Sequence, residues 1–570
     1  MVFKDKNVSG YLLVILFGLI FSLPLLLYGF PIFSFDGRVH SQWATEFTRQ
    51  LFSGDLYPRW LMRLNAGFGS PAFYYYPPTP FYITSFFGLF FYNDPFSLYS
   101  LGLSAFFALI LSGIFTLLWL KKIVSHWAAV AGAILYMLMP YHLLIDLYTR
   151  GSFAEFWAMT WIPLLLLSAH YVAEGGYKSI ILMSVSYALF ITSHLLTTLI
   201  FSPILLFYIF IISNPEKVWR VMVRAVIGLS VGIGLSAFFL VPALGLQYAA
   251  SMWVLTSYPY YNCFVSIKTI LHPKEPSDEF NGFVYLLILS MFVIGLFAGI
   301  IALLNNSSKN KRLIVFWLLV SAFSVFMMTK WSNPIWELFS IIQIIQFPNR
   351  YGTILSIAIA VLISLSLNSI KEPFKIQNVA FILTFLILTT GWLYFTISNV
   401  AYNYNNIFKL YIYKNGLLRD VPEYVPCFVR ADLSKTHLKF QEKQNKPVIF
   451  ENGGGTVNVQ VWKPGKIIFT ANPTNVSTIL VHQYYYPAWD VTINNEPGTI
   501  GISNPDGLLQ LTLPAGDYKV EFILKKTPQE WIGIIISVSS ILFLILFYIV
   551  LSCIRLHNNS KYYKFIRDFL

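Results

Sequence analysis

The sequence has 570 residues, of which 56% are hydrophobic and 11% are charged, and its formal net charge is +13 at neutral pH. Soluble domains carry about 25% charged residues, so the composition excludes a disordered chain, a collagen-like fibre and an ordinary soluble enzyme. A polytopic membrane protein fits instead. Lysines and arginines at the cytoplasmic ends of its spans account for the positive charge without any need for nucleic acid.

The first apolar run covers residues 11–30, and Lys4 and Lys6 precede it. The run is longer than the apolar core of a secretory signal and lacks a small-residue cleavage site. We therefore expect an uncleaved span whose N-terminus is cytoplasmic. A polar and aromatic stretch follows and predicts a long first external loop over residues 31–94. Within this loop, the apolar run 79–92 is expected to lie along the membrane or to re-enter it.

Later apolar runs predict further transmembrane helices that bring the total to about twelve. The runs lie at about 96–119, 126–143, 155–172, 179–193, 195–212, 225–244, 283–304, 313–329, 351–368, 378–398 and 530–551. We divide 179–212 at Ser193-His194, because one helix of that length would be about 51 Å long and the hydrocarbon core is about 30 Å thick. Every short loop that this order places inside carries Lys or Arg. We therefore expect a multi-pass protein of the cytoplasmic (inner) membrane with both termini cytoplasmic.

Residues 399–527 differ from the rest of the chain in being polar and rich in Asn, Gly and Pro. Period-two alternation at 456–461 and 518–522 predicts strands, and turn signals separate the alternating runs. We expect an extracytoplasmic domain that is β-sandwich-like from about 452 onward, with an irregular or helical lead-in. The predicted divisions are a transmembrane module at 1–398, this domain at 399–527, and a last helix with a cytoplasmic tail at 528–570.

Charged side chains at the edge of a membrane are costly and tend to mark function. The first external cluster consists of Asp36, Arg38 and His40, which place an acid, a cation and a base close together in sequence. This pattern suits proton abstraction or anion binding. The alternative is a solvated loop start with a turn at Asp36-Gly37.

The second cluster consists of Asp146, Arg150 and Glu155 and lies between two predicted spans on the same external face. Its arginine suits a phosphate group, whereas Asp146 and Arg150 are also spaced to form a helical i, i+4 ion pair. Arg350 adds a guanidinium at the external mouth of a later span, with an interfacial anchor as the alternative. His194 stands in the polar break of an apolar stretch, where it either contacts substrate or is a satisfied bundle residue.

Several short motifs in a fixed order resemble a known family. They are Phe-x-Phe-Asp-Gly-Arg-x-His at 33–40, Leu-Tyr-Pro-Arg-Trp at 56–60, Tyr-Thr-Arg-Gly-Ser-Phe-Ala-Glu at 148–155, Ser-His at 193–194, Gln-Phe-Pro-Asn-Arg at 346–350 and Tyr-Tyr-Tyr-Pro-Ala-Trp at 484–489. The set is similar to the bacterial membrane proteins labelled 6-pyruvoyl-tetrahydropterin synthase-related. More distantly, it is similar to the glycosyltransferases of superfamily C, which depend on polyprenyl-phosphate sugars. The soluble synthase uses zinc held by three histidines, and no such cluster is visible here, so the label does not imply that reaction.

The resemblance to superfamily C implies a glycosyltransferase-C-like α-helical membrane fold with a carboxylate of the first external loop as catalytic base. Asp36 matches that placement, and Glu155 is the second catalytic candidate. By the same resemblance, Arg150 and Arg350 hold the donor phosphate. The other expected substrate-binding residues are Arg38, His40, Asp146 and His194. A single Asp followed by Gly replaces the paired acids common in the superfamily, so the use of a divalent cation such as Mg or Mn is left open and no metal ligand is assigned.

These inferences predict a membrane glycosyltransferase of the hexosyltransferase type. It would move a sugar from a polyprenyl-phosphate-linked donor to an extracytoplasmic acceptor, which is a cell-envelope glycan, a lipid or a protein. Two alternatives stay open: a transporter of lipid-linked saccharides, and a non-catalytic envelope assembly factor whose β-domain docks a partner. The lack of visible inverted repeats speaks against the transporter.

Overall fold

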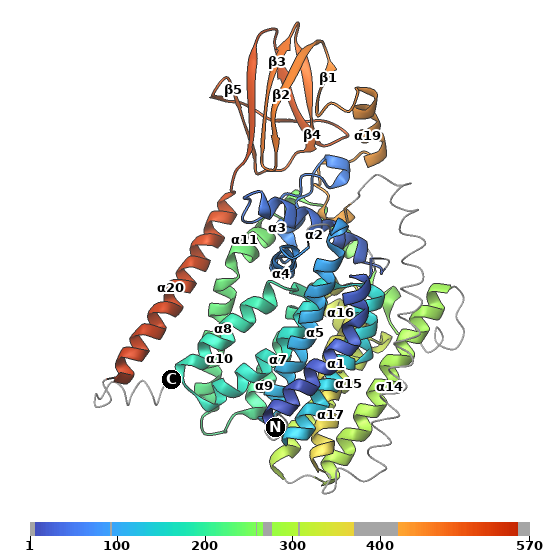
Figure 1. Ribbon diagram of the computed structural model, residues 1–570, viewed down its shortest axis with the longest axis vertical. Coiled ribbons are helices and arrows are strands. Elements are labelled where there is room, and N and C mark those ends of the chain that lie inside the picture. The colour runs from blue at the N-terminus through green and yellow to red at the C-terminus, as the bar shows by residue number, and fades with distance from the viewer. Residues whose placement is uncertain are drawn as a thin grey trace.

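The computed structural model describes residues 6–32, 34–91, 94–257, 259–265, 276–305, 308–369 and 420–556. Figure 1 shows a bundle of long helices with a β-sandwich beyond one of its ends. Short helices of the 31–94 loop, between the first two long helices, lie between these two parts, and the last helix runs back from the sandwich along the bundle. The predicted fold class, a helical membrane protein with a β-domain before the last helix, is confirmed.

Ten helices of the described residues are long and apolar enough to cross a membrane. They are built from α1 (Lys6–Tyr28), α5 (Leu98–Leu120), α6 (His126–Leu138) with the π-helical turns Pro140–Arg150 that extend it, α7 (Phe153–Glu174), α9 (Leu195–Ile212), α10 (Val218–Leu235), α14 (Pro276–Asn305), α15 (Ser308–Met327), α17 (Gly352–Ser369) with the turn before it, and α20 (Pro528–Leu556). The shorter apolar helix α8 (Tyr177–Ile191) precedes α9, so the chain breaks at Ser193-His194 as expected. The expected span 378–398 lies outside the described residues.

The predicted span 225–244 takes a different form. The helix α10 begins earlier, at Val218, and ends before Ser236, after which α11 (Ala237–Gly245) follows as a separate short helix. The Ser236 hydroxyl donates to the Gly232 carbonyl at 2.9 Å. Such back-bonding from a serine competes with the helical hydrogen bonds and accounts for a break that apolar composition does not reveal.

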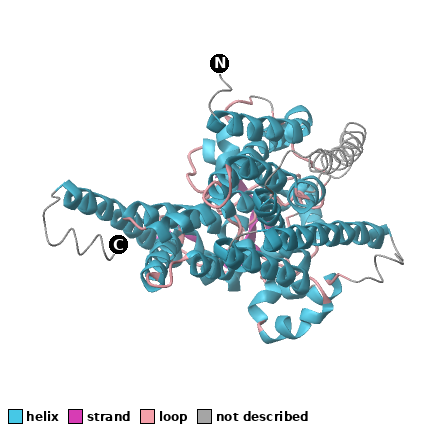
Figure 2. Ribbon diagram, turned by 90° about the horizontal axis from the view of Figure 1, so that it is seen from below, coloured by secondary structure: helices cyan, strands magenta, loops and turns pink. Residues whose placement is uncertain are grey.

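The centre of the bundle is formed by three spans, which contain α6 with its π-helical extension, α7 and α17. In each, 78% of the apolar stretch is buried, compared with 17% for α20, which stands at the edge. Small residues allow close packing between membrane helices, and a Cβ on Gly132 of α6 would lie only 1.9 Å from the Ser364 hydroxyl of α17. Figure 2, a view from the end opposite the sandwich, shows the helices gathered side by side with the strands visible only behind them.

The 31–94 loop is largely helical. It contains α2 (Gly37–Phe52), α3 (Ala72–Tyr75) and α4 (Thr79–Gly88). At about 1.5 Å per residue, α4 is roughly 15 Å long, about half of the hydrocarbon core, so it does not cross. Three further short helices, α12 (Val254–Ser257), α16 (Asn333–Leu338) and α19 (Leu433–Glu442), lie in later connections.

The C-terminal domain is a sandwich of two antiparallel sheets. One sheet has the order β1-β4-β8-β7 and the other the order β2-β3-β9-β5-β6. The strands are β1 (Val448–Asn452), β2 (Gly455–Lys463), β3 (Lys466–Pro473), β4 (Ser477–Tyr484), β5 (Trp489–Ile493), β6 (Glu496–Pro497), β7 (Gly501–Ile502), β8 (Leu508–Leu513) and β9 (Tyr518–Leu524). Alternation places Phe469 of β3 opposite Val520 of β9, and both side chains are fully buried in the core. The alternating sequence pattern therefore corresponds to real strands.

Buried polar contacts fasten the sandwich to the 31–94 loop. Trp60 Nε1 donates to Gln483 Oε1 of β4 at 2.7 Å. Arg59 Nη1 lies 3.2 Å from Glu530 Oε1 at the start of α20, and both side chains are at most 7% exposed. Because this ion pair is buried, each charge depends on the other. The loop, the sandwich and the last helix are therefore held as one unit.

Candidate functional site

The Asp36-Gly37 turn of the 31–94 loop lies directly against the Arg150-Gly151 turn that ends the π-helical segment. The backbone N–H of Asp36 donates to the Arg150 carbonyl at 2.8 Å. Both turns need glycine, because a Cβ on Gly37 or Gly151 would lie 2.4 Å or 2.0 Å from the hydroxyl of Ser34. Gly151 also has a φ of +64°, which favours glycine. The two charged clusters predicted from the sequence are therefore joined by direct backbone contact.

The carboxylate of Asp36 is half-buried and is held on one side only. Ser152, at the start of α7, donates its hydroxyl to Asp36 Oδ2 at 3.2 Å. Among the described residues, Asp36 Oδ1 accepts no hydrogen bond. One oxygen is thus oriented while the other is left to accept a proton from a bound molecule, which is the arrangement a general base requires.

Arg150 connects this turn to a buried polar cluster. Its Nη1 donates to the Tyr141 hydroxyl at 3.0 Å, to Asp146 Oδ1 at 3.1 Å and to Glu155 Oε2 at 3.1 Å. Tyr141, Asp146 and Arg150 share one wide-turned π-helical segment, a feature frequent at functional sites. All hydrogen bonds of Arg150 within the described residues use Nη1, so its Nη2 and Nε remain as donors for a ligand.

Glu155 brings the two predicted arginines together. Arg150 Nη1 lies 3.1 Å from Glu155 Oε2, and Arg350 Nε lies 3.4 Å from the same oxygen. The other oxygen, Oε1, accepts hydrogen bonds from Tyr141 at 3.1 Å and from Thr353 at 3.0 Å. Arg350 is further fixed by a bond from Nη1 to the Ile345 carbonyl at 2.7 Å. Two guanidinium groups that are far apart in sequence therefore converge on one carboxylate oxygen.

Asp146 is the second carboxylate of this cluster. It is fully buried, and while Oδ1 receives a bond from Arg150, Oδ2 has no hydrogen-bond partner. Together with Glu155 it sets two carboxyl groups against the two guanidinium groups of Arg150 and Arg350. A buried charge whose partner is removed destabilises a protein by several kcal/mol, and these four side chains therefore depend on one another.

His40 and Arg38 lie on α2, directly after Asp36. The backbone N–H of His40 donates to the Asp36 carbonyl at 3.0 Å. The His40 ring is buried among aromatic rings, with centroid distances of 5.7 Å to Trp43 and 5.8 Å to Tyr76. Burial lowers the pKa of His40 to about 4, so its imidazole is neutral at neutral pH. Arg38 is exposed. The substrate-binding roles of both residues stay predictions.

His194 stands at the break between α8 and α9. It caps α9, because its Nδ1 accepts from the Thr197 backbone N–H at 3.4 Å and lies 2.7 Å from the Thr197 hydroxyl. The residue is buried and within electrostatic reach of Glu155 and Arg350. His194, which interrupts the apolar run in the sequence, is thus the residue at which α9 begins, close to the cluster of Arg150, Glu155 and Arg350.

Sequence reasoning missed several polar residues that complete the site. Tyr141, Ser152 and Thr353 supply hydroxyl donors to the carboxylates, and Ser152 belongs to a motif whose charged members alone were considered. Asp420 was also missed: Trp43 Nε1 donates to its Oδ1 at 2.9 Å, and the Ser70 hydroxyl donates to its Oδ2. No short-range pattern marks Asp420, because its partners are hundreds of positions away.

The donor set does not favour a metal centre. Within the described residues, no three His, Cys, Asp or Glu side chains lie close enough to hold a metal ion. The carboxylates of Asp146 and Glu155 are already engaged by arginine.

A family model for the 6-pyruvoyl-tetrahydropterin synthase related domain, described as a membrane protein, matches residues 73–398. The match includes Arg150, Glu155 and Arg350 and begins after Asp36. A search of curated proteins gives no match.

Two kinds of solved structure resemble the chain at low identity. The arabinofuranosyltransferase AftD from Mycobacteria is 12% identical with a TM-score of 0.44, and the alignment covers 69% of this chain and 27% of that one. The archaeal oligosaccharyltransferase AglB from Archaeoglobus fulgidus, in complex with an inhibitory peptide and a dolichol-phosphate, is 13% identical with a TM-score of 0.40, covering 69% and 55%. The chain thus spans less than two thirds of either protein. By the family match over more than half of its length, the chain belongs to the membrane proteins with a 6-pyruvoyl-tetrahydropterin synthase related domain.

Proposed function

We propose that this protein is a membrane glycosyltransferase that moves a sugar from a polyprenyl-phosphate-linked donor to an extracytoplasmic acceptor. One observation carries the proposal: Arg150 and Arg350 converge on Glu155 directly behind the turn that holds the half-exposed carboxylate of Asp36. Paired guanidinium groups suit a phosphate, and an adjacent carboxylate with one open oxygen suits a general base. Sugar transfer from a lipid phosphate requires both in one place.

In the proposed reaction, Asp36 Oδ1 takes the proton of the acceptor hydroxyl. The acceptor oxygen forms a bond to the anomeric carbon of the donor sugar while the bond from that carbon to the phosphate oxygen breaks, and the lipid phosphate leaves with the electron pair. Ser152 holds the other carboxylate oxygen, so Oδ1 keeps a fixed direction. A positioned base of this kind contributes roughly 10²–10⁴-fold in rate.

The arginines stabilise the charge that develops on the leaving phosphate. The remaining N–H donors of Arg150, and Nη2 of Arg350, supply hydrogen bonds that strengthen as the phosphate departs. Glu155 acts as a positioning residue in this scheme, since it is buried and fully bonded. No step is routed through a metal ion, because the described donor set does not fit one.

The experiment that tests this function uses the full chain in lipid nanodiscs with polyprenyl-phosphate-linked sugars and extracted envelope glycans as acceptors. Wild type is expected to transfer label to the acceptor, and Asp36→Asn is expected to lose at least 10²-fold in rate while still binding undecaprenyl phosphate. Normal transfer by Asp36→Asn would remove Asp36 as the base. If wild type moves lipid-linked sugar across a vesicle membrane without transferring it to an acceptor, the transporter hypothesis is correct. If it shows neither transfer nor transport, the assembly-factor hypothesis is the one that is left.

A further inference from the structure

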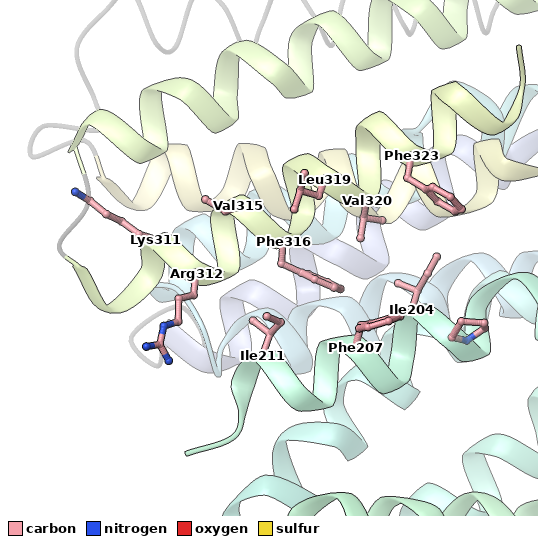
Figure 3. Close-up of a pocket in the computed structure, with 11 residues that line it drawn as sticks. Ile204, Phe207, Ile211, Lys311, Arg312, Val315, Phe316, Leu319, Val320 and Phe323 are labelled. Atoms are coloured by element: carbon pink, nitrogen blue, oxygen red, sulfur yellow. The ribbon is translucent and has the colours of Figure 1, made fainter. Parts of the chain in front are cut away.

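A groove on the outer wall of the bundle lies between α9 and α15. At one end its Phe323 ring lies 6.0 Å from the ring of Tyr351, the residue after Arg350. Figure 3 shows the side chains that line it, and its volume is about 690 Å³. Pro203, in the middle of α9, is one of the lining residues. A proline inside a helix removes a hydrogen bond and bends the axis, which provides room between two neighbouring helices.

The walls of the groove are apolar and open to the outside of the bundle. Phe207 of α9 is 66% exposed, and Leu319 and Phe323 of α15 are 65% and 43% exposed. The floor is closed, because the ring of Tyr208 packs against that of Phe316 at 5.8 Å. In a helix bundle that spans a membrane, such an apolar trough holds the hydrocarbon chain of a lipid.

One end of the groove is charged. Lys311 and Arg312, in the first turn of α15, line the end remote from the sandwich. Both side chains are exposed, and neither forms an ion pair with a carboxylate in the described part of the chain. An amphiphile in this groove therefore meets two cations at its head and hydrocarbon along its body.

The length of the groove selects the kind of lipid. From Lys311 to Phe323 the helix rises about 18 Å at about 1.5 Å per residue. One leaflet contributes about half of the ~30 Å hydrocarbon core, or about 15 Å. The trough thus matches the acyl chain of a lipid from the leaflet that faces away from the sandwich, with its headgroup phosphate beside Lys311 and the planar guanidinium of Arg312.

We propose that this groove is a binding site for an anionic glycerophospholipid, with the headgroup held by Lys311 and Arg312 and one acyl chain lying along Phe207, Leu319 and Phe323. The site lies on the membrane-facing wall, and the proposal does not require that the protein transfers sugar. Its expected selectivity comes from the two cations, since a basic side chain at a membrane surface favours anionic lipid about fivefold.

A second groove provides an internal comparison. It lies between α8 and α20, has a volume of about 610 Å³ and carries a single cation, Lys178, among its lining residues. With one charge in place of two, this groove is expected to show the weaker preference for anionic lipid. Comparing the two grooves shows how much of the preference for anionic lipid comes from charge and how much from the apolar walls alone.

Native mass spectrometry of the full chain tests the proposal. The purified protein is titrated with phosphatidylglycerol and with phosphatidylcholine of identical acyl chains, and the ratio of bound lipids is measured. The double variant Lys311→Gln/Arg312→Gln is expected to lower the preference for phosphatidylglycerol by roughly 25-fold. The swap Lys311→Arg/Arg312→Lys, which keeps both charges, is expected to retain most of it.

The matched control is Lys121→Gln/Lys122→Gln, an adjacent basic pair at the same end of the bundle. These lysines are already engaged: Lys121 lies over the ring of Tyr11 at 5.4 Å, and Lys122 pairs with Glu174 at 2.9 Å. Their removal is expected to change the lipid preference less than twofold. An unchanged preference in Lys311→Gln/Arg312→Gln would overturn the proposal. A competition experiment gives the second outcome that would overturn the proposal. If an equal concentration of undecaprenyl phosphate displaces phosphatidylglycerol from wild type but not from Leu319→Trp, the groove holds a polyprenyl lipid and not a glycerophospholipid.

Discussion

The indole N–H of Trp43 donates to a carboxylate oxygen of Asp420 at 2.9 Å, and this bond joins the first external loop to the segment that leads into the sandwich. Ser70 donates to the other carboxylate oxygen, so Asp420 is held from two parts of the loop. Trp43 lies two helical turns after Asp36 on α2. A shift of the lead-in segment would therefore act directly on α2, the helix that begins immediately after the proposed base Asp36.

This contact predicts a pH dependence of stability. Burial raises the pKa of Asp420 from its ordinary value of 3.8 to about 6. Because the folded state binds the proton more tightly than the unfolded state, Asp420 favours folding fully below about pH 4, and this contribution is lost as the pH rises through 6. The unfolding temperature of wild type is therefore expected to fall between pH 4 and 7, and that of Asp420→Asn is expected to fall less. Thermal unfolding of the full chain in nanodiscs measures both profiles.

The matched control for that experiment is Asp490→Asn in the sandwich. There a hydrogen bond from Lys525 lowers the pKa of Asp490, so its contribution has the opposite sign: it is present above the ordinary pKa and lost in acid. Asp490→Asn is therefore expected to leave the profile between pH 4 and 7 unchanged. Parallel profiles for wild type and Asp420→Asn would contradict the assignment of this window to Asp420.

The arginine site predicts that lysine does not replace arginine. Arg150→Lys keeps the charge but loses the planar fork, so we expect it to weaken binding of undecaprenyl phosphate nearly as much as Arg150→Ala, by about tenfold or more. Arg350→Lys should behave alike. The control is Arg49→Lys, whose guanidinium pairs with the buried Glu46 of the same helix, α2, at 2.6 Å. Full affinity in both alanine variants would leave the two arginines as structural residues.

Glu155→Gln tests whether that carboxylate positions the arginines. The amide keeps an acceptor for Tyr141 and Thr353 but removes the counter-charge shared by Arg150 and Arg350. We expect a loss of about 3 kcal/mol in the free energy of unfolding, as for other buried pairs that lose one partner. Thr353→Val, which removes one hydrogen bond to the same carboxylate, is expected to cost about 2 kcal/mol. Equal losses in the two variants would argue against a charge-positioning role.

The close approach of the two turns predicts a strict need for Gly151. In Gly151→Ala the new methyl group would lie 2.0 Å from the Ser34 hydroxyl, at a φ of +64°. We expect a loss of about 2 kcal/mol or more in stability, combining backbone strain with steric overlap. Gly151→Ala/Ser34→Ala should recover part of this loss, because the overlap is relieved while the strain remains. No recovery in the double variant would assign the whole effect to the backbone.

The elements of the fold follow from patterns that are local in sequence. The alternation at 456–461 and 518–522 became β2 and β9, and Ser193-His194 became the break between α8 and α9, because strand period and hydrocarbon thickness leave few alternatives. The break at Ser236 was not predicted, since one hydroxyl in an apolar run leaves the hydropathy nearly unchanged. Its effect depends on a hydrogen bond to the preceding turn.

For the site, the sequence predicted which charged residues gather and offered one of their ion pairs, that of Asp146 with Arg150, but it did not predict the two ion pairs of Glu155. Topology places the loops of Asp36, Arg150 and Arg350 at one end of the bundle, which is a consequence of span counting alone. The sharing of one Glu155 oxygen by two guanidinium groups depends on side-chain packing. The burial of His40 could not be predicted either. The sequence of a helix in a polar loop does not indicate which of its faces packs against aromatic rings from other segments.

The buried pair of Arg59 and Glu530 also bears on how such a chain can change over evolution. Arg59 precedes the sandwich by almost four hundred positions, yet its counter-charge is supplied by the first turn of the last helix. A relative that lost the sandwich and last helix would keep a guanidinium in an enclosed site with no anion to neutralise it. We therefore expect Arg59 to be replaced by an uncharged residue in any lineage that has lost or exchanged this C-terminal part. The residue at position 59 would then indicate whether the sandwich and last helix are present.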